Sequence, residues 1–219
     1  MLTQNINLKN FSPKKFDKKI QKKLKFILSE NTELLNSLSK NYKDEYNIHR
    51  IKKIVGKNNL RLIGMGGSIL GAQSIYNFLK KKIKKKFVFI DNLVSNQKKR
   101  DKKFSNLIIS KSGNTLETII NANILIKKKH KNIFLTENKS SYIFNLAHNL
   151  KDEVIKHNNF IGGRYSVLSE VGMLPAELMG LNSKKFRQLN NLVRNKKFLD
   201  SLILNTTSIL HFVKKKKFN

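Results

Sequence analysis

Glycine and hydroxyl residues cluster at two points of this 219-residue sequence, each directly after a short apolar run. Residues 64–68 are Gly-Met-Gly-Gly-Ser, and residues 110–115 are Ser-Lys-Ser-Gly-Asn-Thr. Glycine lets the backbone approach a ligand closely, and serine and threonine donate hydrogen bonds to anionic oxygens. Because a helix is expected after each segment, its first N–H groups and the positive end of its dipole would face the same ligand. Both segments therefore predict an anion site that suits a phosphate monoester.

Each segment also has an interpretation without a ligand. Glycine-rich turns between strands and helices are common, and Thr115 before Leu116-Glu117 could serve only to cap a helix. Residues 64–68 are not followed by the Gly-Lys-Ser or Gly-Lys-Thr sequence of a Walker loop. They also lack the third glycine of a dinucleotide-binding fingerprint. Neither nucleotide-binding motif explains this segment.

Residues 161–166, Ile-Gly-Gly-Arg-Tyr-Ser, form a third segment suited to a ligand. A diglycine allows close backbone approach, and the adjacent Arg164 offers a planar guanidinium. Arginine is scarce in this chain beside lysine, so its position here is informative. The alternative is a glycine-rich loop with a surface arginine.

The elements that must position these segments are indicated by the pattern of apolar residues. Short apolar runs predict strands at residues 60–63, 87–91, 107–110 and 133–136, with a fifth strand at 153–156. Stretches of helical length, such as 69–79 and 116–128, alternate with them. This alternation predicts an α/β fold with a doubly wound, five-stranded parallel sheet and helices on both faces. In such sheets, ligands bind beyond the carboxyl ends of the strands, where the first two segments fall.

Helices are also expected before and after the sheet. Ser12 and Pro13 are a plausible N-cap and first residue of a helix, in which Phe16, Ile20 and Leu24 recur at helical spacing. Further helical patterns cover residues 34–38, 44–55, 166–179 and 183–213, with a break or kink expected at Pro175. We therefore expect an N-terminal helical segment at 1–56, an α/β domain at 57–180 and a C-terminal helical segment at 181–219.

The net charge of +31 comes from 45 Lys and Arg residues against 14 Asp and Glu residues. It invites a nucleic-acid-binding interpretation, but the cations are almost all lysine and are spread through the chain. A solvated lysine surface is favoured instead, with no nucleic-acid partner. No apolar run is long enough for a membrane span, no secretory signal is visible, and cysteine is absent. A cytoplasmic protein without a membrane partner is the expectation.

In order along the chain, residues 64–68, 110–118 and 162–169 resemble the glucose-6-phosphate isomerase family. The domains of that family are sugar-isomerase (SIS) folds with a flavodoxin-like sheet. The middle motif is shared by many phosphosugar-binding SIS proteins, whereas Gly-Gly-Arg-Tyr-Ser is much narrower. The resemblance covers about residues 57–180. Glu170 stands where the family usually has a small residue or proline, which leaves the local helix geometry open.

The resemblance implies a role for each matched residue. The residues that would hold the sugar phosphate are Ser68, Ser110, Ser112 and Thr115, with Lys111 adding charge. Gly67 would contact substrate through its backbone, and Gly163 and Arg164 would lie at the sugar end. Arg164 would be the catalytic residue of this set, helping ring opening and stabilising the developing enediolate oxygen. No metal and no organic cofactor is implied.

The implied activity is the interconversion of glucose 6-phosphate and fructose 6-phosphate, in glycolysis and gluconeogenesis, by a homodimer when full length. The family's general-base glutamate lies in a second SIS domain, so this chain is expected to be truncated before it and inactive alone. The five histidines match no family position, and Glu117 is expected to serve the helix start. Two alternatives stay open: a bifunctional phosphoglucose/phosphomannose isomerase, and a non-catalytic SIS protein that binds phosphosugars.

Overall fold

The computed structural model describes residues 17–93, 104–127, 130–137, 139–189 and 195–215. The chain divides into two units. One is Lys43–Ser183, and the other combines the residues up to Tyr42 with those from Lys184 onward. The expected N-cap Ser12, with Pro13 and Phe16, lies outside the described residues.

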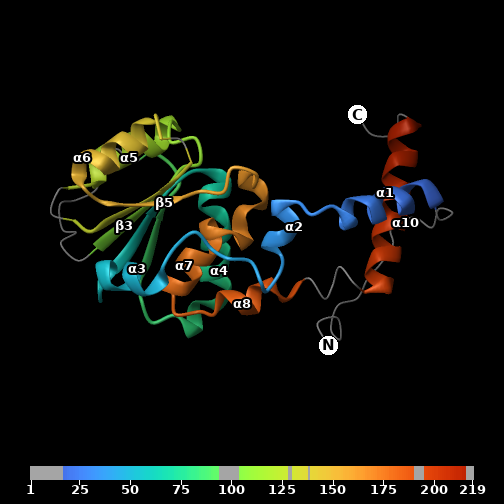
Figure 1. The fold of residues 1–219 in the computed structure, drawn as a ribbon, viewed down its shortest axis with the longest axis horizontal. Helices are drawn as coiled ribbons and strands as arrows, with labels where there is room; N and C mark the ends of the chain where they lie inside the picture. The colour runs from blue at the N-terminus through green and yellow to red at the C-terminus, as the bar shows by residue number, and fades with distance from the viewer. Residues whose placement is uncertain (1–16, 94–103, 128–129, 138, 190–194, 216–219) are drawn as a thin grey trace. The chain divides into compact units, whose positions relative to one another are not determined.

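The unit Lys43–Ser183 is built around a sheet of five parallel strands (Figure 1). The strands are β1 (Asn59–Ile63), β2 (Phe87–Ile90), β3 (Phe104–Ile109), β4 (Asn132–Thr136) and β5 (Glu153–Lys156). Their order is β2-β1-β3-β4-β5, and every neighbouring pair is parallel. The predicted α/β fold with a doubly wound parallel sheet is therefore confirmed. This order reverses direction between β1 and β3, which makes their carboxyl ends the topological switch point.

Helices cover both faces of the sheet (Figure 1). On one face, α5 (Leu116–Leu125) and α6 (Tyr142–Leu150) pack against Ile63, Ile108 and Phe134 through Ala122 and Ala147. The other face carries α3 (Ile48–Val55), α4 (Leu70–Leu79) and α7 (Glu170–Leu178). The ring of Tyr76 on α4 lies 5.5 Å from the rings of both Phe87 and Phe89. Strand residues point alternately to the two faces, and because helices cover both faces, nearly all residues of β1, β3 and β4 are buried.

The helix expected over residues 166–179 begins later than predicted. A 3-10 helix, η3 (Gly163–Leu168), precedes α7, because Val167 is held between two glycines. A Cβ atom on Gly71 would lie 2.7 Å from Val167 Cγ2, and one on Gly172 would lie 2.1 Å from the Val167 carbonyl oxygen. The buried Glu170, which departs from the resembled family, is the first residue of α7.

The break expected at Pro175 does not occur. The helix α7 continues through Pro175 to Leu178, and the Met179 N–H donates to the Pro175 carbonyl oxygen (2.9 Å). Pro175 lies in the second turn, where its missing N–H removes one bond near the helix start. The helix is buried along nearly its whole length, and this packing outweighs the lost bond.

Side chains cap most of the remaining helices. In the unit that contains the chain ends, α1 (Lys18–Ser29) is capped by Asp17, α2 (Glu33–Ser37) by Thr32 and α10 (Lys196–Lys214) by Asn195. The helix expected over 44–55 begins only at Ile48, because Asn47 accepts from the N–H groups of His49 and Arg50. The region 183–213 contains α8 (Ser183–Phe186), the 3-10 turn η4 (Arg187–Leu189) and α10. The other 3-10 turns are η1 (Gly66–Ser68) and η2 (Lys80–Lys82). No helix among the described residues has both the length and the apolar character that crossing a membrane requires.

A row of buried polar side chains crosses the sheet on the face covered by α5 and α6. The Arg61 Nη1 donates to Asn106 Oδ1 (3.4 Å), and Asn106 Nδ2 donates to Asn132 Oδ1 (2.7 Å). Asn132 Nδ2 then donates to Asp152 Oδ2 (2.8 Å). Arg61, Asn106 and Asn132 are all at most 2% exposed. Burial raises the pKa of Asp152, although the hydrogen bond from Asn132 acts in the opposite direction.

Candidate functional site

The two glycine- and hydroxyl-rich turns lie side by side at the switch point. One follows β1 and the other follows β3, and these strands are neighbours in the sheet. A Cβ atom on Gly64 would lie 2.9 Å from the carbonyl oxygen of Ile109, so the strand ends touch through their backbones. The sheet therefore places both candidate anion-binding turns where ligands of doubly wound folds bind.

The turn after β3 gathers its three hydroxyls. The buried Ser110 Oγ donates to Thr115 Oγ1 (3.3 Å), and Ser112 Oγ lies 3.5 Å from the same atom. Ser110 Oγ also accepts from the N–H of Gly113 (3.1 Å), and Ser112 Oγ accepts from the N–H of Asn114 (3.3 Å). The structure thus brings Ser110, Ser112 and Thr115 together, and we call this group the hydroxyl cradle.

Gly113 makes the tight form of this turn possible. Its φ is +67°, a region that favours glycine. A Cβ atom there would lie 2.0 Å from Ser141 Oγ and 2.9 Å from Thr136 Oγ1. The Gly113 carbonyl oxygen accepts from the N–H of Ile143 (3.1 Å), which ties the cradle to the first turn of α6. The cradle is therefore fixed on two sides before any ligand is present.

Neither helix that starts at the switch point is capped by a side chain. Thr115 occupies the N-cap of α5, yet its side chain accepts no bond from the helix, and Ile69 caps α4 without a side-chain bond. By contrast, Asn47 caps α3 and Ser141 caps α6 through their side chains. Because Thr115 directs its hydroxyl to the cradle, the interpretation of Thr115 as a mere helix cap is not supported. The first N–H groups of α5 stay available to an anion.

The Gly-Gly-Arg segment joins this edge through backbone contact with the turn after β1. A Cβ atom on Gly67 would lie 2.2 Å from the Gly163 carbonyl oxygen. Ser166 Oγ donates to that oxygen (2.7 Å) and lies 3.4 Å from the Gly67 carbonyl oxygen. Arg164 is exposed, and its side chain forms no hydrogen bond or ion pair with the residues that the structure describes. Its guanidinium is therefore available to a ligand.

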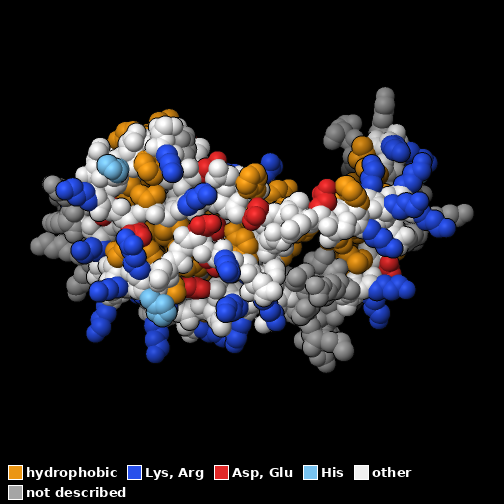
Figure 2. Space-filling view, in the orientation of Figure 1, with side chains coloured by type: hydrophobic (Ala, Val, Ile, Leu, Met, Phe, Trp, Pro, Cys, Tyr) orange, Lys and Arg blue, Asp and Glu red, His pale blue; other side chains and the backbone are white. Residues whose placement is uncertain are grey.

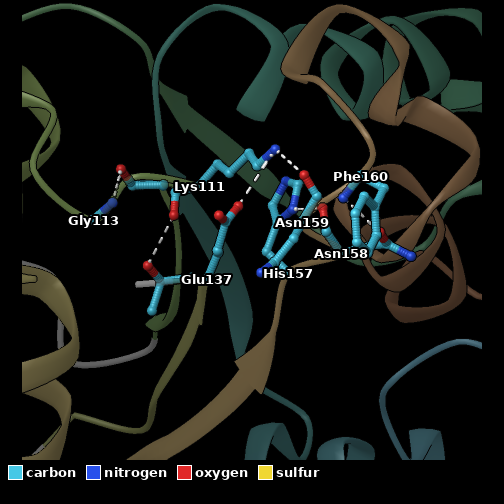
Figure 3. A network of polar contacts seen from close by, with 9 residues as sticks. Lys111, Gly113, Glu137, His157, Asn158, Asn159 and Phe160 are labelled. Carbon is cyan, nitrogen blue, oxygen red and sulfur yellow. Dashed lines mark hydrogen bonds and ion pairs between the residues drawn. The ribbon is translucent and has the colours of Figure 1, made fainter. Parts of the chain in front are cut away.

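Lys111 differs from the other residues expected at the phosphate. Its ammonium donates to the Asn159 carbonyl oxygen (2.6 Å) and lies 3.4 Å from Glu137 Oε2, on the side away from Gly113 (Figure 3). The sequence analysis identified neither Glu137 nor Asn159. Glu137 directly follows β4, so its place at the carboxyl edge of the sheet was a usable signal. Asn159 contributes only its backbone carbonyl oxygen, and the residue type at a position does not indicate such a backbone contact.

His157, directly after β5, is another residue that the sequence analysis did not place at this edge. It is 1% exposed, its N–H donates to the Thr136 carbonyl oxygen (3.1 Å), and its Nδ1 lies 2.9 Å from the Asn158 carbonyl oxygen. Burial lowers the pKa of its imidazole, so the neutral form is favoured. Within the described ranges, no three His, Asp or Glu side chains are grouped as a metal site requires.

The strand order and the paired turns at the switch point define a doubly wound α/β domain with the flavodoxin-like strand order. A family model described as phosphoglucose isomerase matches residues 27–209, so the chain belongs to the phosphoglucose isomerase family. The glucose-6-phosphate isomerase of Methanocaldococcus jannaschii is 34% identical over 188 residues, covering 78% of this chain and 46% of that protein. The glucose-6-phosphate isomerase of Acholeplasma laidlawii is 34% identical over 166 residues, covering 65% and 39%. The chain thus spans less than half the length of either relative.

Solved structures share the fold. A hypothetical protein from Thermus thermophilus aligns with a TM-score of 0.66 at 20% identity, covering 89% of this chain and 52% of its own. A glucose-6-phosphate isomerase from Chlamydia trachomatis aligns with a TM-score of 0.54, also at 20% identity, covering 77% and 41%. At this identity the likeness concerns the fold alone.

Proposed function

We propose that this chain supplies the phosphate-binding half of a glucose-6-phosphate isomerase site, which interconverts glucose 6-phosphate and fructose 6-phosphate. The observation that carries the proposal is the hydroxyl cradle at the uncapped start of α5. Three hydroxyls and the first N–H groups of a helix match the acceptor oxygens of a phosphate monoester. In this assignment the phosphate rests on Ser110, Ser112 and Thr115, with Ser68 contributing from the neighbouring turn.

The sugar end of the substrate is assigned to the Gly-Gly-Arg loop. Gly67 and Gly163 have no side chains, so the backbone there can approach the ligand closely. The guanidinium of Arg164 is exposed and forms no described contact, so it can donate to a sugar oxygen that gains negative charge in the enediol intermediate. Arg164 is therefore the residue of this chain to which we assign a catalytic role.

Proton transfer between C1 and C2 needs a carboxylate beside those carbons. We propose that this base lies outside the present residues. Glu117 is in the first turn of α5, where its charge favours the helix dipole, and Glu137 is engaged by Lys111. The chain alone should therefore bind the phosphate end of the substrate without turning it over.

A bifunctional phosphoglucose/phosphomannose isomerase would use the same cradle, because both substrates carry the same phosphate. Isomerisation rates of the complete enzyme with mannose 6-phosphate and with glucose 6-phosphate would distinguish the two activities. A non-catalytic phosphosugar-binding protein would need no guanidinium at the sugar end, so the exposed Arg164 favours the enzyme. We also propose a homodimer for the full-length protein.

Nucleic acid is not proposed as a partner. On the face shown in Figure 2, lysine and arginine side chains lie at many places over the chain and are densest over α1 and α10. Any DNA binding should be blind to sequence and should vanish at moderate salt, because it rests on counterion release alone. Sequence-selective binding at physiological salt would contradict the enzyme assignment.

Titration of the purified chain with fructose 6-phosphate, followed by amide chemical shifts in NMR spectra, tests the proposal. Shifts should centre on the N–H groups of residues 110–118, and Ser112→Ala should weaken binding about 10- to 150-fold, the loss of one hydrogen bond to a charged group. A coupled assay in both directions should show no turnover by the chain alone. Binding that leaves residues 110–118 unperturbed would remove the cradle from the site, and robust turnover would show that the base is among the chain's own carboxylates.

A further inference from the structure

We propose that the Lys111 side chain positions the Gly-Gly-Arg loop and is not a direct ligand of the phosphate. Its backbone belongs to the turn after β3, whereas its ammonium is bonded to the turn that precedes Gly163 and Arg164. Lys111 would then couple the phosphate end of the site to the sugar end. The meaning of this coupling rests on the proposed function, but the tether itself can be tested without any substrate.

Lys111 is fixed at both ends. Its carbonyl oxygen accepts from the N–H of Glu137 (3.1 Å) and from Thr136 Oγ1 (3.3 Å), which binds the backbone to the end of β4. Its Nζ donates to the Asn159 carbonyl oxygen at 2.6 Å (Figure 3). A cation bonded to a carbonyl oxygen at this distance is a charge-assisted hydrogen bond, stronger than one between neutral groups.

Glu137 balances the positive charge of Lys111. Its Oε2 lies 3.4 Å from Lys111 Nζ, and the two side chains are only 28% and 30% exposed. The carboxylate therefore neutralises much of the positive charge with which Lys111 would otherwise attract a substrate phosphate. A lysine meant chiefly for the phosphate would not need an anionic partner of its own at this position.

The turn that receives the tether is otherwise held by local bonds. The N–H of Phe160 donates to Asn158 Oδ1 (2.9 Å), and the N–H of Ile161 donates to the Asn158 carbonyl oxygen (3.3 Å). Asn159 and Phe160 are exposed, so packing contributes little at the tip. Ile161 is fully buried, and Gly163 and Arg164 follow directly after it. The bond to Asn159 and the buried Ile161 therefore both restrain the short stretch of chain that leads into the Gly-Gly-Arg segment.

The test is amide hydrogen exchange of the chain without ligand, read at Phe160, Ile161 and Tyr165. Lys111→Met should speed exchange at these amides about 10-fold or more, because the turn loses its charge-assisted bond. Lys111→Arg, which keeps a donor cation, should restore most of the protection. Lys156→Met removes an exposed lysine at the end of β5 and should change nothing. Exchange at Ile108 in the sheet core reports whether each variant is folded.

A second variant and a phosphate titration separate the tether from a direct phosphate contact. Glu137→Gln keeps the charge of Lys111 but removes the carboxylate that pairs with it. If Lys111 is a tether, its bond to Asn159 should weaken, and amide hydrogen exchange at Ile161 should become faster. Under our proposal, Lys111→Met changes the affinity for inorganic phosphate less than about 3-fold, far below the loss expected for a charged ligand. The proposal is overturned if Lys111→Met lowers phosphate affinity 10-fold or more while exchange at 160–165 stays unchanged. If the unaltered chain binds no phosphate, the proposed function fails, and the exchange data still decide the tether.

Discussion

The carbonyl oxygen of Gly163 lies 2.2 Å from the point where a Cβ atom on Gly67 would stand. Two loops that are far apart in the sequence thus touch through their backbones, and a methyl group at Gly67 must push one of them away. We expect Gly67→Ala to lower the free energy of unfolding by about 1–3 kcal/mol and to weaken sugar-phosphate binding. Urea unfolding and a fructose 6-phosphate titration measure the two effects.

Gly162→Ala is the matched control for this substitution. A Cβ atom at Gly162 would meet only Tyr165 Cδ2, at an ordinary contact distance of 3.8 Å, and its φ of −69° suits alanine. It should unfold at nearly the same urea concentration as the unaltered chain. Equal stability of the Gly67 and Gly162 variants would show that the two loops can separate freely.

Thr115→Val should separate binding from stability. The Thr115 hydroxyl does not cap α5 but faces Ser110 and Ser112, so its removal should leave the free energy of unfolding nearly unchanged. Phosphate affinity should fall about 10-fold or more, because one donor to a charged ligand is lost. Calorimetric titration with inorganic phosphate, beside thermal unfolding, gives both values.

Asn47→Ala is expected to behave in the opposite way. Asn47 caps α3 by accepting from the N–H groups of His49 and Arg50, so its loss should cost about 1 kcal/mol of stability and leave phosphate binding unchanged. A Thr115→Val variant that loses stability but retains phosphate affinity would assign Thr115 to the helix and not to the cradle.

His157 should make stability depend on pH. Burial lowers its pKa below the usual 6.5, so the folded state binds the proton less readily than the unfolded state. Its contribution is therefore present above pH 6.5 and is lost as the pH falls through the folded pKa. Urea unfolding of the unaltered chain between about pH 7.5 and pH 5, compared with His157→Asn, should show a smaller loss in the variant.

The comparison concerns slopes with pH and not absolute stabilities, because any change at the buried His157 also alters packing. Parallel slopes for the unaltered chain and His157→Asn would mean that this imidazole does not titrate differently in the two states.

Asp152 should show the reverse sign. Its pKa is raised by burial, so its contribution to stability is greatest at low pH and declines as the pH rises through the folded pKa. Asp152→Asn should remove this decline and make the chain slightly more stable at pH 7, since the amide oxygen can still accept from Asn132. Asp152→Ala should destabilise the chain, because the buried Asn132 amide loses its acceptor. Unfolding of the three proteins at about pH 7 and pH 4.5 distinguishes them; a less stable Asn variant at pH 7 would contradict the expectation.

The strands and the cradle could be predicted because their signals are local. Apolar runs that end in glycine and serine marked β1 and β3, and the hydroxyls after β3 were close enough in sequence to be grouped. The 3-10 turn before α7 could not be predicted, because Val167 packs not only against Gly172 of α7 but also against Gly71 of α4, which is distant in the sequence. The direction of the Lys111 ammonium was hidden for a similar reason, since its acceptor is a backbone oxygen of a distant turn.

The buried polar row across β1, β3 and β4 specifies which strands pair and in which register. Short apolar strands bury similar surface in several pairings, so apolar burial alone does not choose among them. In the observed register Arg61 stands opposite Asn106, and Asn106 stands opposite Asn132. A slip by one residue would send these side chains to the opposite face and leave buried amides unpaired, at a cost of about 1–3 kcal/mol each. The row therefore selects the observed strand pairing, because a sheet with incorrectly paired strands would have a higher free energy than the native sheet.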